Sequence, residues 1–213
     1  MSQKKIRTAL YNVLPGEKAH SQMAPRPKYI EGIEGKHTCP PVNSAVLVLV
    51  VPYGDNLAIP FIQRSNRGKY HGGQIAFPGG KMEKGDANAL QTALRECHEE
   101  IGVPEEKVSI LGVLSDIYIP LSNFNITPIV GTTLKLPDFT LSPEEVDKVI
   151  LISLSDLFND ENKTTHSFIR HDHEIVAPGY KIGEYFIWGA TAMIIAELEQ
   201  LMKTNTFNHL GRL

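Results

Sequence analysis

The sequence predicts a mixed α/β sandwich formed by one domain with additions. The chain has 213 residues, which is roughly 1.4 typical domain lengths. Strand-like segments come first, one helical segment follows, and more strands precede a closing helical segment; this order is typical of a single α/β domain. Hydrophobic residues make up 42% of the chain and charged residues 21%, a composition that excludes global disorder.

The start of the chain is expected to form an N-terminal extension, residues 1–40, packed on a body of residues 41–213. Four apolar side chains have loose helical spacing that Pro15 and Gly16 end: Ile6, Leu10, Val13 and Leu14. Prolines then interrupt the segment up to residue 41, so an irregular but packed course is predicted.

The body begins with strands. Residues 45–51 are apolar and rich in valine, which predicts a central strand, and residues 57–63 follow a turn as its hairpin partner. After a glycine-rich loop, residues 86–101 carry apolar side chains at helical spacing, and Gly102 stands where such a helix would end. Further strands are predicted over 108–120, 126–134, 146–154 and 168–182, and a closing helix over 190–202.

Charge and hydropathy exclude two classes of partner. The net charge is −3, whereas nucleic-acid-binding domains usually carry a basic surplus. The longest apolar run, residues 45–51, is far shorter than the roughly 20 residues that cross a bilayer. The first residues lack the apolar stretch of a secretory signal, so a cytoplasmic location is expected. Cys39 and Cys97 have no metal-binding spacing, and Cys97 is predicted to be a buried, reduced thiol.

Three glutamates of the helical segment are the main candidates for chemistry. Glu96, Glu99 and Glu100 project into one sector about 100° wide, beside the apolar stripe. Carboxylate oxygens suit Mg²⁺, although a solvated acidic face would have the same spacing. The preceding glycine pair at 79–80 favours the cation site, because glycine lets the backbone approach a ligand closely. Asp86 is either the N-cap of the helix or a further metal ligand.

This segment resembles the Nudix box. The usual form of the box is G, five residues, E, seven residues, then R-E-U-x-E-E-x-G-U, where U is a bulky aliphatic residue. The positions that match are Gly80, Arg95, Glu96, Glu99, Glu100, Gly102 and Val103. Asp86 replaces the first Glu, eight residues rather than seven separate it from the arginine, and Cys97 replaces one aliphatic residue. The resemblance implies a Nudix-type α/β/α sandwich with a mixed central sheet and a catalytic loop-helix-loop.

A second motif is similar to the element that marks the coenzyme A pyrophosphatase branch of that family. The element reads L-L-T-x-R-[SA]-x3-R-x3-G-x3-F-P-G-G, and here Lys69 replaces its second arginine, which keeps the charge but loses bidentate geometry. For the cations of this motif, a solvated basic face is the alternative to phosphate contact. The substrate-binding residues that the resemblance implies are Arg64, Arg67, Lys69, Gly73, Phe77, Gly79 and Gly80.

The resemblance implies metal-dependent hydrolysis of the pyrophosphate bond of coenzyme A or acyl-CoA, giving 3′,5′-ADP and (acyl-)4′-phosphopantetheine. Mg²⁺ or Mn²⁺ would be held by the three glutamates, and whether Asp86 is a fourth ligand is left open. The implied catalytic residues are Arg95, Glu96 and Glu99. The general base is either Glu99 or Glu145, an acid outside the box that would otherwise lie in an exposed turn.

Two alternatives stay open at this stage. The same box also serves diphosphatases for ADP-ribose, NADH or nucleoside triphosphates, and a Nudix-fold module could bind a ligand without catalysis, although the retained acids disfavour that interpretation. Trp188 is predicted to be a core residue rather than a platform for adenine. The expected partner is a small nucleotide-type substrate, with no nucleic acid and no membrane, and a homodimer is one of the open assembly states.

Overall fold

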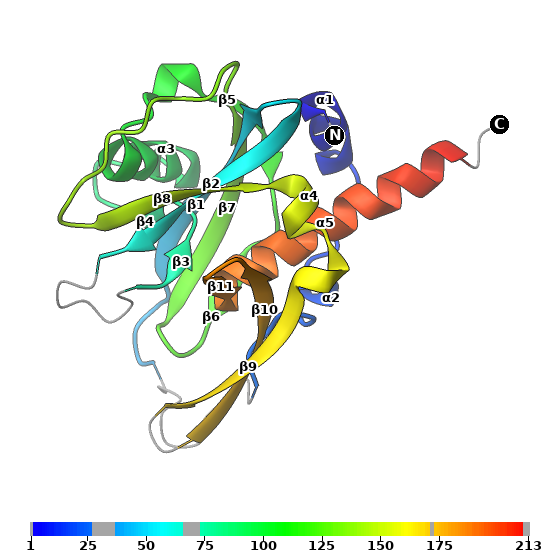
Figure 1. The fold of residues 1–213 in the computed structure, drawn as a ribbon. Helices are drawn as coiled ribbons and strands as arrows, with labels where there is room; N and C mark the ends of the chain where they lie inside the picture. Colours follow the sequence, from blue (N-terminus) through cyan, green and yellow to red (C-terminus); the bar gives the residue numbers. More distant parts are fainter. Residues whose placement is uncertain (1, 27–36, 66–72, 171–172, 211–213) are drawn as a thin grey trace.

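The computed structural model describes residues 2–26, 37–65, 73–170 and 173–210, which form three layers (Figure 1). Within these residues, α3 (Ala89–Ile101) covers one face of an eight-stranded sheet, and α5 (Gly189–Leu210) lies on the other face. The sheet is mixed, because β1 and β7 run parallel while the other neighbours are antiparallel. The predicted mixed α/β sandwich is confirmed.

The central strand, β1 (Val42–Tyr53), is apolar on both sides because both of its faces are covered. Leu47 and Leu49 pack in the cluster that includes the buried face of α3, whereas Val48 and Val50 pack in the cluster that includes α5. All four side chains have 0% exposure. The continuous apolar run that predicted this strand is therefore the sequence pattern of a strand buried twice.

β1 and β2 (Asn56–Arg64) form a hairpin whose strands separate beyond the first few residues. The two strands pair only next to the turn, from Val51 opposite Ala58 to Tyr53 opposite Asn56. Beyond this point, β3 (Ile75–Ala76) pairs with β2 and β4 (Gly79–Lys81) pairs with β1, so residues 75–81 lie between the two separated strands. β8 (Val146–Ser153) pairs with the other edge of β2.

On the far side of β1, β7 (Phe124–Thr132) pairs with β5 (Ser109–Val113) and with β6 (Ile117–Ile119). The prediction of one strand over 108–120 is wrong, since Ser115 turns its backbone N–H and its hydroxyl toward Glu197 and interrupts the ladder. The 3₁₀ helix η1 (Glu105–Lys107) connects α3 to β5.

A second, three-stranded antiparallel sheet follows, formed by β9 (Lys163–Arg170), β10 (His173–Ile182) and β11 (Tyr185–Trp188). This sheet extends from residue 163 to residue 188, whereas only short strands over 168–182 were expected. The short elements α4 (Leu154–Leu157) and η2 (Asp160–Asn162) connect β8 to β9.

The N-terminal segment contacts the closing helix through α1 (Gln3–Leu10) and α2 (Glu17–His20). Ile6 is fully buried in the core cluster beneath α5. The buried carboxylate of Glu197 accepts a hydrogen bond from the Gly16 N–H at 2.9 Å and lies 3.0 Å from His20 Nε2. No helix in the described residues is long and apolar enough to span a membrane.

Candidate active site

The helix that carries the glutamates, α3, has a cap at each end. The Asn88 side chain accepts a hydrogen bond from Gln91 N at 3.1 Å, so the N-cap is Asn88 and the N-cap interpretation of Asp86 is wrong. Gly102 ends the helix as predicted, with a left-handed φ of 72°. Cys97 is buried as a free thiol, and burial raises its pKa to about 12. Cys97 belongs to the apolar stripe of α3, together with Ala93 and Ile101, and this stripe packs against the sheet.

The two glycines of β4 meet two of the glutamates in different ways. Gly79 N–H donates to Glu100 Oε2 at 2.8 Å, and a Cβ at Gly79 would lie 2.4 Å from the backbone oxygen of Ala45. A Cβ at Gly80 would lie 2.5 Å from the carboxylate of Glu96. Gly79 is therefore required by its contact with β1, whereas Gly80 leaves room for a functional side chain.

Arg95 organises the exposed side of the site. Its Nη1 lies 2.9 Å from Glu96 Oε1 and 2.8 Å from Glu99 Oε2. Its Nε and Nη2 each donate to one oxygen of Asp86 at 3.0 Å, a bidentate pair. Hydrogen bonds from Arg95 and from the Glu83 N–H hold the pKa of Asp86 well below its usual range. Asp86 also accepts from the Thr92 hydroxyl, so the structure places it as the partner of Arg95.

Glu100 is the buried member of the cluster. Its side chain is 1% exposed, and burial raises its pKa to about 7 despite the Gly79 N–H and the nearby charge of Arg64. Arg64 Nη1, at the end of β2, lies 3.6 Å from Glu100 Oε1. This contact brings the first cation of the upstream motif to the box helix.

Glu96, Glu100 and Glu145 act on one another electrostatically. Burial raises the pKa of Glu96, and the charges of Glu99 and Glu145 raise it further; Glu145 also raises the pKa of Glu100. Glu145 is half-buried, and its backbone oxygen accepts from Ser65 N at 2.9 Å. Its influence on both pKa values indicates that this loop acid lies near the cluster, although it follows Glu100 by 45 positions in the sequence.

The remaining predicted substrate-binding residues differ in placement. Gly73 lies beside Arg64, to whose backbone oxygen its N–H donates at 2.8 Å. Phe77 is 2% exposed and packs against Phe61 with ring centroids 4.9 Å apart, so its ring is part of the core, and its contact with substrate stays a prediction. Arg67 and Lys69 lie outside the described residues.

The donor set can be compared with the needs of a divalent cation. Besides burial, the charges of Glu99 and Glu145 raise the pKa of Glu96, which lies beside Gly80, and like-charged carboxylates with oxygen donors suit a hard cation. In the described part of the chain, no three acidic, histidine or cysteine side chains already converge as a ligating group. The positive group between Glu96 and Glu99 is the Arg95 guanidinium. The donor chemistry of Glu96, Glu99 and Glu100 therefore fits a cation, while the side-chain positions seen here are those of the Arg95-paired arrangement.

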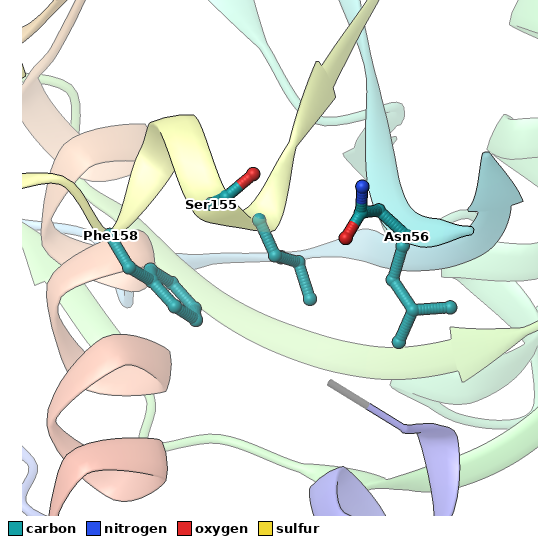
Figure 2. Close-up of a pocket in the computed structure, with 5 residues that line it drawn as sticks. Asn56, Ser155 and Phe158 are labelled. Atoms are coloured by element: carbon teal, nitrogen blue, oxygen red, sulfur yellow. The ribbon is translucent and has the colours of Figure 1, made fainter. Parts of the chain in front are cut away.

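Two hollows lie outside this cluster. One, of about 340 Å³, is at the opposite end of β2 from Arg64, and Figure 2 shows Asn56, Ser155 and Phe158 around it. The residues that line it are Asn56, Leu57, Leu154, Ser155 and Phe158, and none of these five is charged. The other hollow, of about 410 Å³, is lined by residues of β2, β3 and β11, including Trp188. Trp188 is half-buried, so the prediction of a core tryptophan is only partly right.

Comparison with known proteins indicates the same family as the motif on α3. The model of the NUDIX domain matches residues 43–172. An uncharacterized Nudix hydrolase, NudL from Enterobacter sp. (strain 638), is 38% identical over 138 residues, 64% of this chain and 70% of that protein. The human mitochondrial coenzyme A diphosphatase NUDT8 is 33% identical over 187 residues, 84% of this chain and 78% of that protein.

Solved structures share the fold. The MutT protein from Methanosarcina mazei Go1 superimposes with a TM-score of 0.52 at 16% identity, over 79% of this chain and 97% of that chain. RenU, a Nudix hydrolase from M. Smegmatis, has a TM-score of 0.53 at 14% identity, over 79% and 88% of the two chains. The matched domain, the relatives and the R-E-x-x-E-E helix agree, and the chain belongs to the Nudix hydrolase family.

Proposed function

We propose that this Nudix hydrolase cleaves the pyrophosphate bond of coenzyme A or acyl-CoA, giving 3′,5′-ADP and (acyl-)4′-phosphopantetheine. The observation that carries the proposal is the contact between Arg64 and Glu100, which joins the upstream basic motif to the box helix. The similarity to a human protein named as a coenzyme A diphosphatase supports it. A cation beside a metal-binding carboxylate suits a substrate with a charged pyrophosphate.

Nudix hydrolases generally use divalent metal ions such as Mg²⁺ or Mn²⁺. Glu96, Glu99 and Glu100 are the residues proposed to hold the ion. When bound, it would neutralise charge on the pyrophosphate and make a water molecule more acidic.

The remaining steps belong to side chains of this chain. Arg95 is a positioning residue: it holds Glu96 and Glu99 and is itself fixed by Asp86. Arg64 would contact a phosphate oxygen. Glu99, whose side chain is 53% exposed, and Glu145 are the two groups proposed to take the proton of the attacking water. The pH dependence of kcat should change in the Glu99→Gln variant if Glu99 is the base, and in the Glu145→Gln variant if Glu145 is the base.

A substrate panel tests the proposal. Purified protein with Mg²⁺ would be assayed with CoA, 3′-dephospho-CoA, ADP-ribose, NADH and nucleoside triphosphates, and kcat/KM compared. We expect CoA or an acyl-CoA to have the highest kcat/KM and Arg64→Ala to lower it. Hydrolysis of ADP-ribose, NADH or a nucleoside triphosphate with no hydrolysis of CoA would instead support the alternative diphosphatase.

A further inference from the structure

The hydroxyl of Thr92 is a buried polar group in the first turn of α3, where its side chain has 0% exposure. Its Oγ1 donates to Asp86 Oδ2 at 2.9 Å. The contact with the backbone oxygen of Asn88, one turn earlier in the helix, is longer at 3.3 Å. A threonine that served only its own helix would rely on the second contact. The hydroxyl is therefore directed at the loop that precedes α3.

The carboxylate of Asp86 is held from several directions, and its side chain is 3% exposed. Its Oδ1 accepts from Arg95 Nε at 3.0 Å, and its Oδ2 accepts from Arg95 Nη2 at 3.0 Å. Two donors outside the guanidinium, the Glu83 N–H and the Thr92 hydroxyl, also reach Oδ2, each at 2.9 Å. A bidentate pair needs the carboxylate and the guanidinium to align. The two additional donors restrict the rotation of the carboxylate that would break this alignment.

Arg95 carries this restraint to the glutamates. While Asp86 holds Nε and Nη2, the remaining Nη1 lies 2.9 Å from Glu96 Oε1 and 2.8 Å from Glu99 Oε2. Thr92 precedes Glu96 by four positions and Glu99 by seven, so all three side chains lie along one side of the helix. A short series of contacts therefore connects a buried hydroxyl with two of the carboxylates proposed to hold the metal ion.

We propose that Thr92 is a positioning residue, whose hydroxyl fixes Asp86 and thereby sets where Arg95 holds Glu96 and Glu99. The proposal rests on the proposed function in taking these glutamates as metal ligands. Removal of a group that orients metal ligands typically lowers metal affinity or activity about 10- to 100-fold. Because Thr92 acts through two further side chains, its effect should lie near the lower end of that range.

Thr92→Val tests the proposal, since valine has nearly the same shape as threonine but no donor. Without substrate, this variant should bind Mn²⁺ about 10-fold more weakly than wild type in calorimetric titration. At saturating metal, kcat for CoA should also fall about 10-fold, with little change in KM. Thr92→Ser keeps the donor and should restore both the Mn²⁺ affinity and kcat.

Thr132→Val is the matched control. Thr132 is also buried, at 5% exposure, and its hydroxyl donates to the Val50 backbone oxygen at 2.7 Å. Each valine variant therefore loses one buried hydroxyl hydrogen bond, and both should unfold at lower urea concentration than wild type. Thr132→Val should nevertheless keep the Mn²⁺ affinity and the kcat of wild type, because its hydroxyl has no contact with Asp86.

Four results would overturn the proposal: no saturable Mn²⁺ binding by wild type, wild-type Mn²⁺ affinity in Thr92→Val, equal losses in Thr92→Val and Thr132→Val, or no rescue by Thr92→Ser. If Thr92→Val does not fold, Thr92→Ala removes the same hydroxyl with the best helix-forming residue and takes its place. Because the Mn²⁺ titration needs no substrate, failure of wild type to hydrolyse CoA would refute the proposed function and leave the Mn²⁺ result intact.

Discussion

The neighbouring glycines of β4 give a sharp test of how the site is built. Alanine at position 80 would place a Cβ 2.5 Å from the Glu96 carboxylate, so that carboxylate must move by at least about 0.5 Å to reach the 3.0 Å limit of real contacts. The atom that must move is at the end of a flexible side chain, and alanine also restricts the unfolded chain. We therefore expect the free energy of unfolding of Gly80→Ala to stay within about 1 kcal/mol of wild type.

The activity of Gly80→Ala should behave differently from its stability. Displacement of a positioned group by about 1 Å can cost roughly 100-fold in rate, so kcat for CoA is expected to fall by about that factor. Gly79→Ala is the matched control, because its Cβ would lie 2.4 Å from the backbone oxygen of Ala45 and the strand itself would have to move. That variant should lose about 1–3 kcal/mol of stability.

The two variants would be compared by urea unfolding and by CoA hydrolysis with Mg²⁺. Gly80→Ala with wild-type kcat would refute the inference that the position of Glu96 matters. Equal loss of stability in both variants would refute the inference that only Gly79 is limited by backbone.

Three further changes follow from the described contacts. Asp86→Ala removes the bidentate partner of Arg95 and should lower kcat about 10- to 100-fold, with a smaller change in KM, measured by steady-state hydrolysis. Glu197→Gln should cost about 1–3 kcal/mol at pH 7 in urea unfolding. Burial alone would raise the pKa of Glu197, but hydrogen bonds from His20, Ser115 and Gly16 lower it overall. Wild type therefore holds this stability above about pH 4.5 and loses it as pH falls through the lowered folded-state pKa, whereas the variant should have a flatter profile. Phe77→Ala should cost about 3–5 kcal/mol by thermal unfolding, since the ring is core.

Each of these changes has a contradicting result. Unchanged kcat in Asp86→Ala would mean that Arg95 is held without it. Parallel stability–pH profiles for wild type and Glu197→Gln would show that this carboxylate does not link folding to pH. If Phe77→Ala is as stable as wild type but has a raised KM for CoA, the ring contributes to substrate binding and not to the core.

The sequence predicted those features that depend on local periodicity. The stripe through Cys97 and the stop at Gly102 define α3 without any knowledge of the sheet, and the spacing of the glutamates follows from the same helix. The apolar strand β1 was predicted for a similar reason, since burial on both faces leaves an uninterrupted apolar run.

Features that depend on tertiary partners could not be predicted in this way. The role of Asp86 depends on Arg95 reaching back over nine positions, and the burial of Phe77 depends on Phe61 in another strand. Glu197 is a charged residue inside an otherwise apolar helix face, and only the N-terminal segment and Ser115 explain its burial. The hollow beside Trp188 joins residues from two sheets.

Product analysis is the most direct test of the central claim. Purified protein would be incubated with CoA and Mg²⁺, and the products separated by chromatography, beside a Glu99→Gln variant and a reaction with the metal chelated. The account predicts equal amounts of 3′,5′-ADP and 4′-phosphopantetheine from wild type, and a large loss of both in the other two reactions. Intact CoA after incubation with metal-replete wild type would contradict it.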